Sequence, residues 1–304
     1  MRNQQLKAAI ERRGERARQA REVCRLVAGA ADQLDGLVID RLGDFAFATL
    51  MQDRLPVERE DLEALLALLN LRGLTVRQRR KGGQGYAMTQ LGDRLPDRIV
   101  LNEGHARVVL RIHPESLSYG LFPDLRYERL KVGEQAHSKS VLNLYAYSGL
   151  FGIHAALSGA QRVIQVDALK STLAMIRANE EANQVQTIRL CEDALLYCQR
   201  ASRRNERFDL VIHDPPTFGR TPKGKARSLK KSLVELLSAS MSVVHDGGQL
   251  LSVINTASLS KRFVAEAHQQ AATLANVELQ FDRALMIDPS APTPLKGGWY
   301  TLRR

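Results

Sequence analysis

The stretch Val141-Leu-Asn-Leu-Tyr-Ala-Tyr-Ser-Gly-Leu-Phe-Gly152 decides the fold of this chain. Its first half is rich in strand formers, Ser148 and Gly149 supply a turn, and residues 151–158 continue as an apolar helix. A strand that runs through a short loop directly into a helix leaves free backbone N–H groups at the helix start. These groups can hold a ligand carboxylate or phosphate, so the stretch predicts a nucleotide-type site at a strand end.

The sequence after this stretch alternates between strand and helix patterns. We expect strands at 141–146, 162–166, 187–190, 208–212 and 249–254 and helices at 150–158, 171–183, 194–203, 229–244 and 261–275. Two further segments, 277–286 and 299–302, read as a closing pair of strands. This alternation is typical of an α/β fold in which a parallel sheet has helices on both faces.

The sequence before this stretch has a different character. The pattern of residues 3–30 predicts one arginine-rich helix. We assign residues 1–21 as a basic N-terminal helix, separate from the domain that follows. This helix could lie along a phosphate backbone or serve as a solvated linker. Residues 22–112 predict a small α+β domain with two strands around a Gly43-Asp44 turn, a helix at 57–72 and strands near 75–79 and 106–112. The catalytic domain is then expected at 113–304.

The charge of the chain favours a polyanionic partner. Its 304 residues contain 44 Lys and Arg against 33 Asp and Glu, a net charge of +11. Basic residues concentrate in residues 11–25, 77–81 and 220–231. Three cysteines, the lack of an apolar membrane-length run and the lack of a secretory leader predict a cytoplasmic protein without disulfides or membrane contact.

Acidic residues follow the second and third expected strands of the parallel sheet. Asp167 is placed to accept hydrogen bonds from ribose hydroxyls, and Asp193 to lie beside an adenine. Either residue could instead cap the helix that follows it. The loop at 146–149 has only Gly149 and Gly152 of a G-x-G-x-x-G pattern, which disfavours nicotinamide and flavin dinucleotides and leaves a smaller adenosine cofactor with a carboxylate.

The fourth strand end carries Asp214-Pro-Pro-Thr-Phe218. Two prolines directly after a buried strand fix the backbone and hold Asp214 and the nearby carbonyls in one place. Phe218 offers a ring on which a planar base can stack. His213 and His154 are interpreted as packed residues rather than bases, and the sequence shows no cluster of metal ligands.

Taken together, these motifs resemble class I S-adenosylmethionine-dependent methyltransferases, and more closely the bacterial 23S rRNA methyltransferases of the cytosine-C5 and guanine-N7 kind. The resemblance rests on residues 36–44, 119–126 and 143–149 and covers residues 22–304. It implies a Rossmann-like seven-stranded methyltransferase domain preceded by a small α+β domain, with residues 113–134 as a candidate lid. The implied S-adenosylmethionine site comprises Phe122, Arg126, Asn143, Tyr145, Tyr147, Ser148, Gly149, Asp167, Asp193 and Asp214.

The chain departs from this group in two ways. Many members begin with an RNA-binding PUA domain, for which we expect no counterpart in these 304 residues, so RNA affinity is expected from the basic helix, the small domain and the basic loop after Phe218. A C5 enzyme needs a nucleophile that attacks C6, normally a thiolate, but the corresponding strand end reads Val253-Ile-Asn-Thr-Ala-Ser258. Guanine N7 or an exocyclic amine needs only correct placement against the sulfonium methyl.

We therefore predict direct methyl transfer to a base nitrogen of RNA, most simply 23S rRNA, with Asp214, Pro215 and Phe218 orienting the target. Three alternatives stay open: a C5 enzyme with an unplaced nucleophile, a methyltransferase for a small molecule or protein, and a non-catalytic RNA-binding assembly factor. The sequence also leaves open a homodimer.

Overall fold

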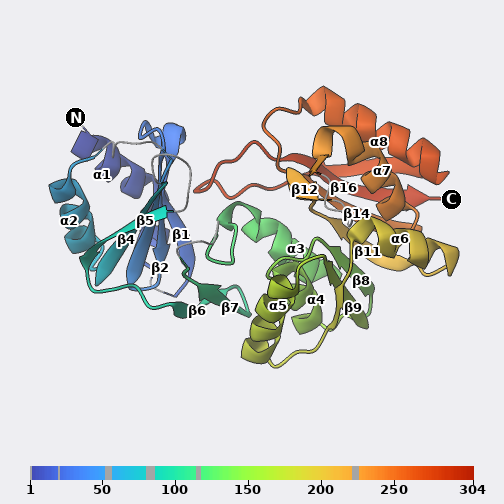
Figure 1. Ribbon diagram of the computed structural model, residues 1–304, viewed down its shortest axis with the longest axis horizontal. Coiled ribbons are helices and arrows are strands. Elements are labelled where there is room, and N and C mark those ends of the chain that lie inside the picture. Colours follow the sequence, from blue (N-terminus) through green and yellow to red (C-terminus); the bar gives the residue numbers. More distant parts are fainter. Residues whose placement is uncertain (1, 20, 52–56, 80–85, 114–117, 221–225) are drawn as a thin grey trace. The chain divides into compact units, whose positions relative to one another are not determined.

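The computed structural model describes residues 2–19, 21–51, 57–79, 86–113, 118–220 and 226–304. Two compact units make up the chain (Figure 1). Unit 1 holds Met1–Arg126 and Asp288–Pro292, and unit 2 holds Tyr127–Ile287 and Thr293–Arg304. Unit 1 thus continues past residue 112, the boundary that the sequence predicts. Parts of two predicted basic clusters, residues 80–81 and 221–225, lie outside the described residues.

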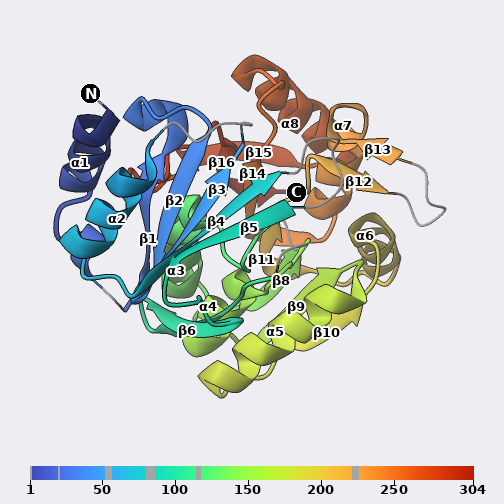
Figure 2. The same cartoon turned by 60° about the vertical axis from the view of Figure 1, so that its left-hand side comes forward.

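Unit 1 is built on a five-stranded sheet whose strands lie in sequence order. The strands are β1 (Val23–Ala28), β2 (Leu37–Leu42), β3 (Phe45–Leu50), β4 (Gly73–Arg79) and β5 (Tyr86–Gly92). β3 and β4 pair in parallel and the other neighbours pair antiparallel. Helices α1 (Arg2–Arg13) and α2 (Arg59–Leu68) lie on the same side of the sheet (Figures 1 and 2), and their leucines share a core with the inward face of the strands.

The prediction of one helix over residues 3–30 is wrong. The helix ends at Arg13, a 3-10 turn follows at Gly14–Arg18, and β1 begins at Val23. β1 has two buried residues for each partly buried one, and its Arg25 forms an ion pair with Asp40 on the neighbouring strand at 2.8 Å. Tertiary pairing therefore overrides the helical pattern of this segment.

The predicted Gly43-Asp44 hairpin, the helix after it and strand β4 are confirmed. The strand predicted near 106–112 exists as β7 (Ala106–Arg111), but it lies outside the five-stranded sheet. It pairs with β6 (Arg98–Glu103), which the sequence did not predict, in a separate antiparallel hairpin. Strand β5 was also missed, because its alternation of exposed and partly buried residues includes few strongly apolar side chains.

Unit 2 contains a seven-stranded sheet in the order β10-β9-β8-β11-β14-β16-β15. Its strands are β8 (Ser140–Leu144), β9 (Arg162–Asp167), β10 (Ile188–Cys191), β11 (Phe208–His213), β14 (Val244–Ile254), β15 (Glu278–Ala284) and β16 (Lys296–Arg303). The first five are parallel, and β16 runs antiparallel to both of its neighbours. The predicted α/β fold with a Rossmann-like seven-stranded sheet is confirmed.

Two groups of helices pack on unit 2's sheet. The helices are α3 (Arg126–Gln135), α4 (Leu150–Leu157), α5 (Lys170–Asn183), α6 (Ala194–Arg203), α7 (Leu229–Met241) and α8 (Lys261–Ala275). α6, α7 and α8 share one core with the strands, while α4 contacts α5, β8 and β9. A short pair, β12 (Phe218–Arg220) and β13 (Ala226–Ser228), precedes α7. None of the described helices is long and apolar enough to cross a bilayer.

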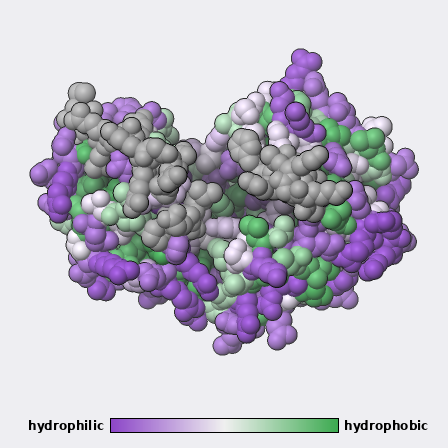
Figure 3. Space-filling model, viewed as in Figure 1, coloured by the Kyte–Doolittle hydropathy of each residue, from purple (hydrophilic) through white to green (hydrophobic). Residues whose placement is uncertain are grey.

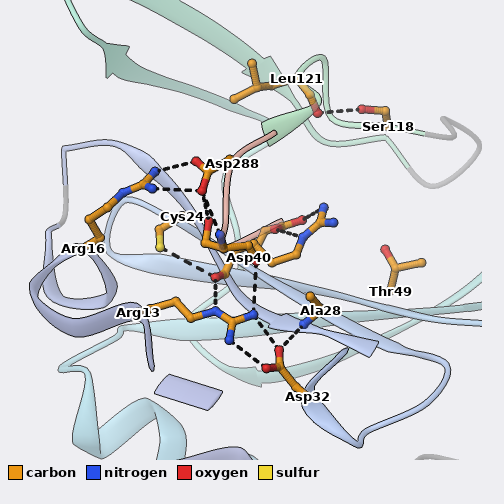
Figure 4. Close-up of polar contacts among 12 residues, drawn as sticks. Arg13, Arg16, Cys24, Ala28, Asp32, Asp40, Thr49, Ser118, Leu121 and Asp288 are labelled. Atoms are coloured by element: carbon orange, nitrogen blue, oxygen red, sulfur yellow. Dashed lines mark hydrogen bonds and ion pairs between the residues drawn. The ribbon is translucent and has the colours of Figure 1, made fainter. Parts of the chain in front are cut away.

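Several arginines of the N-terminal segment are bound within unit 1 (Figure 4). Arg13 and Arg12 each approach the buried carboxylate of Asp32 to 2.6 Å. Arg16 donates twice to Asp288 at 3.0 Å, and Asp288 is 1% exposed. Since the guanidinium groups of Arg13 and Arg16 are held by buried carboxylates, these two arginines stabilise the fold, whereas the side chain of Arg12 is 51% exposed. These ion pairs weaken the interpretation of the segment as an RNA-contacting helix. Hydrophilic side chains cover much of the face of the molecule that Figure 3 shows.

We expect Asp32→Asn to destabilise the protein by about 3–5 kcal/mol, because Arg13 is only 5% exposed and would keep its charge without a carboxylate. Urea unfolding followed by circular dichroism measures this loss. The control is Glu63→Gln, which breaks the exposed pair with Arg59 and should cost less than about 1 kcal/mol. Equal effects of the two substitutions would contradict the structural role of Asp32.

Candidate active site

The loop between β8 and α4 adopts an unusual backbone. Tyr145 and Tyr147 have positive φ values of 57° and 50°, and Gly149 has φ of 77°. Left-handed conformations are uncommon for residues with a large side chain and cost on the order of 1 kcal/mol or more each. Such strain persists where the surroundings fix the loop, and it is concentrated at functional sites. The predicted strand–loop–helix is confirmed, and its shape is more constrained than the sequence indicated.

Side chains from β9 and α5 fix this loop. The carboxylate of Asp167, at the end of β9, accepts from the backbone N–H of Tyr147 at 2.9 Å and from that of Leu169 at 3.0 Å. Asn179, fully buried on α5, donates its amide to the carbonyl oxygen of Ser148 at 2.9 Å. Asn179 could not be identified from the sequence, since an asparagine in the middle of a helix carries no signal of its tertiary partner.

The two glycines of the loop make room for a buried glutamine. A Cβ atom at Gly149 or Gly152 would come within 2.9 Å of the side chain of Gln165. Gln165 accepts from the amide of Asn143 at 3.0 Å and donates to Thr187 at 3.1 Å. Asn143, a predicted cofactor residue, is 1% exposed. Its side chain forms a buried polar pair with Gln165, which packs against the two glycines of the loop.

Asp193 begins α6, and its carboxylate accepts from the N–H of Leu196 at 3.1 Å. The alternative interpretation of Asp193 as a helix cap is thus realised. Large apolar side chains are exposed beside the same strand ends: Leu169 is 61% exposed and Leu196 45% exposed. The sequence analysis missed both. A leucine two or three residues after a strand-end acidic residue, as at Asp167 and Asp193, is a signal that could have identified them.

The Asp214-Pro-Pro-Thr segment is tied to the end of β14. The hydroxyl of Thr217 donates to the carbonyl oxygen of Asn255 and accepts from the hydroxyl of Thr256 at 3.2 Å. Lys296, at the start of β16, donates to the carbonyl oxygens of Thr256 at 2.8 Å and of Pro294 at 2.9 Å. β16 runs antiparallel to β14, so its first residue lies at the edge where the parallel strands end. Asp214 is partly buried at this edge.

His213 is packed, as predicted. It is fully buried, its Nδ1 lies 2.9 Å from the hydroxyl of Ser240, and its ring meets that of Tyr145 edge to face. Burial, with a smaller contribution from His268, lowers the pKa of His213 to about 3. A histidine with this pKa is neutral at pH 7 and is a weak proton acceptor. His154 is also buried, within α4.

No cysteine stands at the end of β14, and the three cysteines of the chain lie elsewhere. Cys24 is buried in β1, where desolvation raises the pKa of its thiol to about 11. Burial likewise raises the pKa of Cys198, on α6, above its usual range. Cys191 is exposed in β10, at the far edge of the sheet order from β14. The described residues contain no group of acidic, histidine and cysteine side chains that could hold a metal.

Phe122 and Arg126 belong to unit 1. Phe122 is 46% exposed and precedes a 3-10 turn at Pro123–Leu125. Arg126 pairs with both carboxylate oxygens of Glu22, at 2.7 and 3.0 Å. The Phe218 backbone pairs with Ser228 in the β12–β13 ladder, and its side chain lies outside the described part of the structure.

The neutral state of His213 predicts a pH-dependent stability. An unfolded histidine binds a proton near pH 6.5, whereas the folded state resists it until about pH 3. The free energy of unfolding should therefore fall as the pH drops below 6.5, with His213 contributing about 1.4 kcal/mol per pH unit. Denaturant unfolding between pH 7 and 5 of wild type and His213→Asn measures this contribution. An unchanged slope in the variant would contradict it, and the exposed His245→Asn serves as control.

Curated relatives carry the name ribosomal RNA large subunit methyltransferase I. The protein of this name from Salmonella arizonae is 28% identical over 257 residues, covering 80% of this chain and 63% of the relative. That from Escherichia coli is 26% identical over 259 residues, covering 80% and 64%. This chain therefore spans less than two thirds of the length of these relatives.

Solved methyltransferase structures share the fold. SMU.776, a methyltransferase complexed with SAH, superimposes with a TM-score of 0.85 at 21% identity, covering 99% of this chain and 80% of that one. Trm5b from Pyrococcus abyssi gives a TM-score of 0.59 at 17% identity, covering 87% and 72%. The family model described as S-adenosylmethionine-dependent methyltransferase matches residues 32–294. This match covers most of the 304 residues and includes the site at the strand ends. It shows that the chain belongs to the S-adenosylmethionine-dependent methyltransferase family.

Proposed function

We propose that this protein methylates a base nitrogen of RNA, guanine N7 or an exocyclic amine, in 23S rRNA. The observation that carries the proposal is the Asp214-Pro-Pro-Thr segment held against a β14 end that has no cysteine. The net charge of +11 and the ribosomal RNA methyltransferase names of the relatives support an RNA substrate in the cytoplasm.

The residues around the β8–α4 loop fit S-adenosylmethionine. The N-cap of α4 is Gly149, which has no side chain to cap the helix, so the N–H groups of the first turn can receive the carboxylate of the amino acid moiety. In our proposal Asp167 holds the ribose hydroxyls with the acceptor positions that its two backbone partners leave open, and Leu169 and Leu196 flank the adenine. Tyr145, Tyr147 and Ser148 contact the remainder of the cofactor. When bound, S-adenosylmethionine supplies an electrophilic methyl group on a positively charged sulfonium.

The target base is oriented by residues after β11. The Asp214 carboxylate and the Pro215 carbonyl oxygen accept hydrogen bonds from an amine, and Phe218 stacks on the ring. Thr217, Thr256 and Lys296 keep this segment in place through β14 and β16. For guanine N7 correct placement suffices, because its in-plane lone pair attacks the methyl group as the sulfonium leaves as a neutral thioether, and no covalent intermediate is needed. For an exocyclic amine, the proton that the methyl group replaces passes to the Asp214 carboxylate, which accepts a hydrogen bond from that amine. The proposal assigns the three cysteines no part in the reaction, in keeping with their positions.

Asp167→Ala should raise the dissociation constant for S-adenosylmethionine at least tenfold. Loss of two hydrogen bonds to a carboxylate costs more than about 1.4 kcal/mol, which is a factor of ten in affinity. Titration calorimetry measures the constant, and Glu181→Gln, on the exposed side of α5, should bind as the wild type does. Circular dichroism checks that the variant is folded. Unchanged affinity in a folded Asp167→Ala protein would remove Asp167 from the site.

The reaction itself is tested with tritiated S-adenosylmethionine and an unmodified 23S rRNA transcript. We expect radioactivity in an N-methylated nucleoside after complete digestion, and about a 100-fold slower turnover for Asp214→Ala, because misplacing the target by about 1 Å has this effect. Exposed Lys261→Gln should retain full turnover. Label in 5-methylcytidine would establish the C5 alternative, and label in no RNA together with label in protein or a small molecule would exclude an RNA substrate.

A further inference from the structure

Hairpin β6–β7 of unit 1 has one buried and one basic face. Residues on one face pair across the hairpin and are largely buried: Leu101 with Val108 and Glu103 with Ala106. On the opposite face, Arg98 pairs with Arg111 and Asn102 with Arg107, and all four are exposed. Between these two pairs lies Val100 opposite Val109, of which Val109 is 3% exposed and Val100 partly buried. The hairpin is visible in Figure 1 below the five-stranded sheet.

Arg98 and Arg111 stand directly opposite each other on this face. The N–H of Arg111 donates to the carbonyl oxygen of Tyr119 at 2.9 Å, outside the hairpin, while the adjacent N–H of Ile112 donates to Asp97 at 2.9 Å. The Arg98–Arg111 pair is therefore a non-hydrogen-bonded pair, the kind that brings side chains closest. Like charges directly opposite destabilise a sheet.

No carboxylate compensates this pair in the described part of the chain. The neighbouring arginines Arg94 and Arg72 do have acidic partners, Asp97 at 3.2 Å and Asp93 at 2.9 Å. Glu103 belongs to the buried face of the hairpin and is 2% exposed. The isolated parallel bridge between Glu22 and Asn102 places Glu22 on the same face as Asn102, where Glu22 is already paired with Arg126 at 2.7 Å.

We propose that this face of the β6–β7 hairpin binds the phosphate backbone of the RNA substrate; this rests on the proposed function. A phosphate placed between Arg98 and Arg111 replaces their repulsion with two charge-assisted contacts, and guanidinium groups match phosphate oxygens in geometry. Arg107 and Arg111 are four residues apart on one strand, roughly 13 Å, which is long enough to follow several consecutive phosphates. The face has no exposed apolar anchor of the kind that membrane binding uses.

The test compares two double variants with the same change in charge. Arg98→Gln with Arg111→Gln removes the proposed contacts, and Arg59→Gln with Arg72→Gln removes two exposed arginines of unit 1 that already have carboxylate partners. Binding of a fluorescein-labelled 23S rRNA transcript is measured from 50 to 300 mM KCl. We expect the first variant to bind at least tenfold more weakly at 100 mM, with a salt slope smaller by about 1.5, and the control to match the wild type.

Each outcome separates the hairpin assignment from the proposed function. Methyl transfer to RNA by the wild type, combined with wild-type affinity and salt slope in the Arg98/Arg111 variant, would overturn the hairpin assignment alone. RNA binding that depends on the two arginines, without methyl transfer to any RNA, would count against the proposed function alone. Equal losses of RNA affinity in both double variants would also overturn the assignment. Binding to phosphatidylglycerol vesicles is measured in parallel, and an Arg98/Arg111 variant that loses vesicle binding but keeps RNA binding would overturn it as well. Unchanged calorimetric affinity for S-adenosylmethionine confirms that unit 2 is intact in the variant.

Discussion

The candidate site depends on the hydrogen bonds that the carboxylate of Asp167 accepts. By accepting from the N–H groups of Tyr147 and Leu169, this carboxylate joins the loop after β8 to the start of α5 across the ends of two neighbouring parallel strands. The loop contains two tyrosines in left-handed conformations, and these would relax without such restraint. Asn179 adds a second restraint from α5. The strain is thus held by a few side chains whose positions the parallel sheet sets.

The sequence was sufficient to predict unit 2 but not all of unit 1. Buried parallel strands are apolar runs that end at Asp167 or Asp214, and these signals are local. In unit 1, β1 contains Arg25, whose buried ion pair with Asp40 on β2 stabilises a strand where the sequence suggests a helix. Within the candidate site, the strand-end residues were found from the sequence. Gln165, Asn179, Thr256 and Lys296 were not, because their roles are set by tertiary partners and not by neighbours along the chain.

The arginines show why total charge is an incomplete guide to a binding surface. In the N-terminal segment, Arg12, Arg13 and Arg16 are bound to carboxylates of Asp32 and Asp288, so their charges are compensated within unit 1. Arg98 and Arg111 lie instead opposite each other on an exposed face. Whether the charge of an arginine is compensated within the fold therefore depends on the location of the nearest carboxylate, which the ion pairs reveal and the sequence alone does not.

Mapping of modified nucleosides in cells tests the central claim of base-nitrogen methylation most directly. Ribosomal RNA from cells with and without the gene for this protein is digested and analysed by mass spectrometry. The account predicts that one N-methylated nucleoside disappears from 23S rRNA in the deletion strain and returns with the wild-type gene but not with Asp214→Ala. Loss of a 5-methylcytidine instead, or an unchanged set of modified nucleosides, would contradict it.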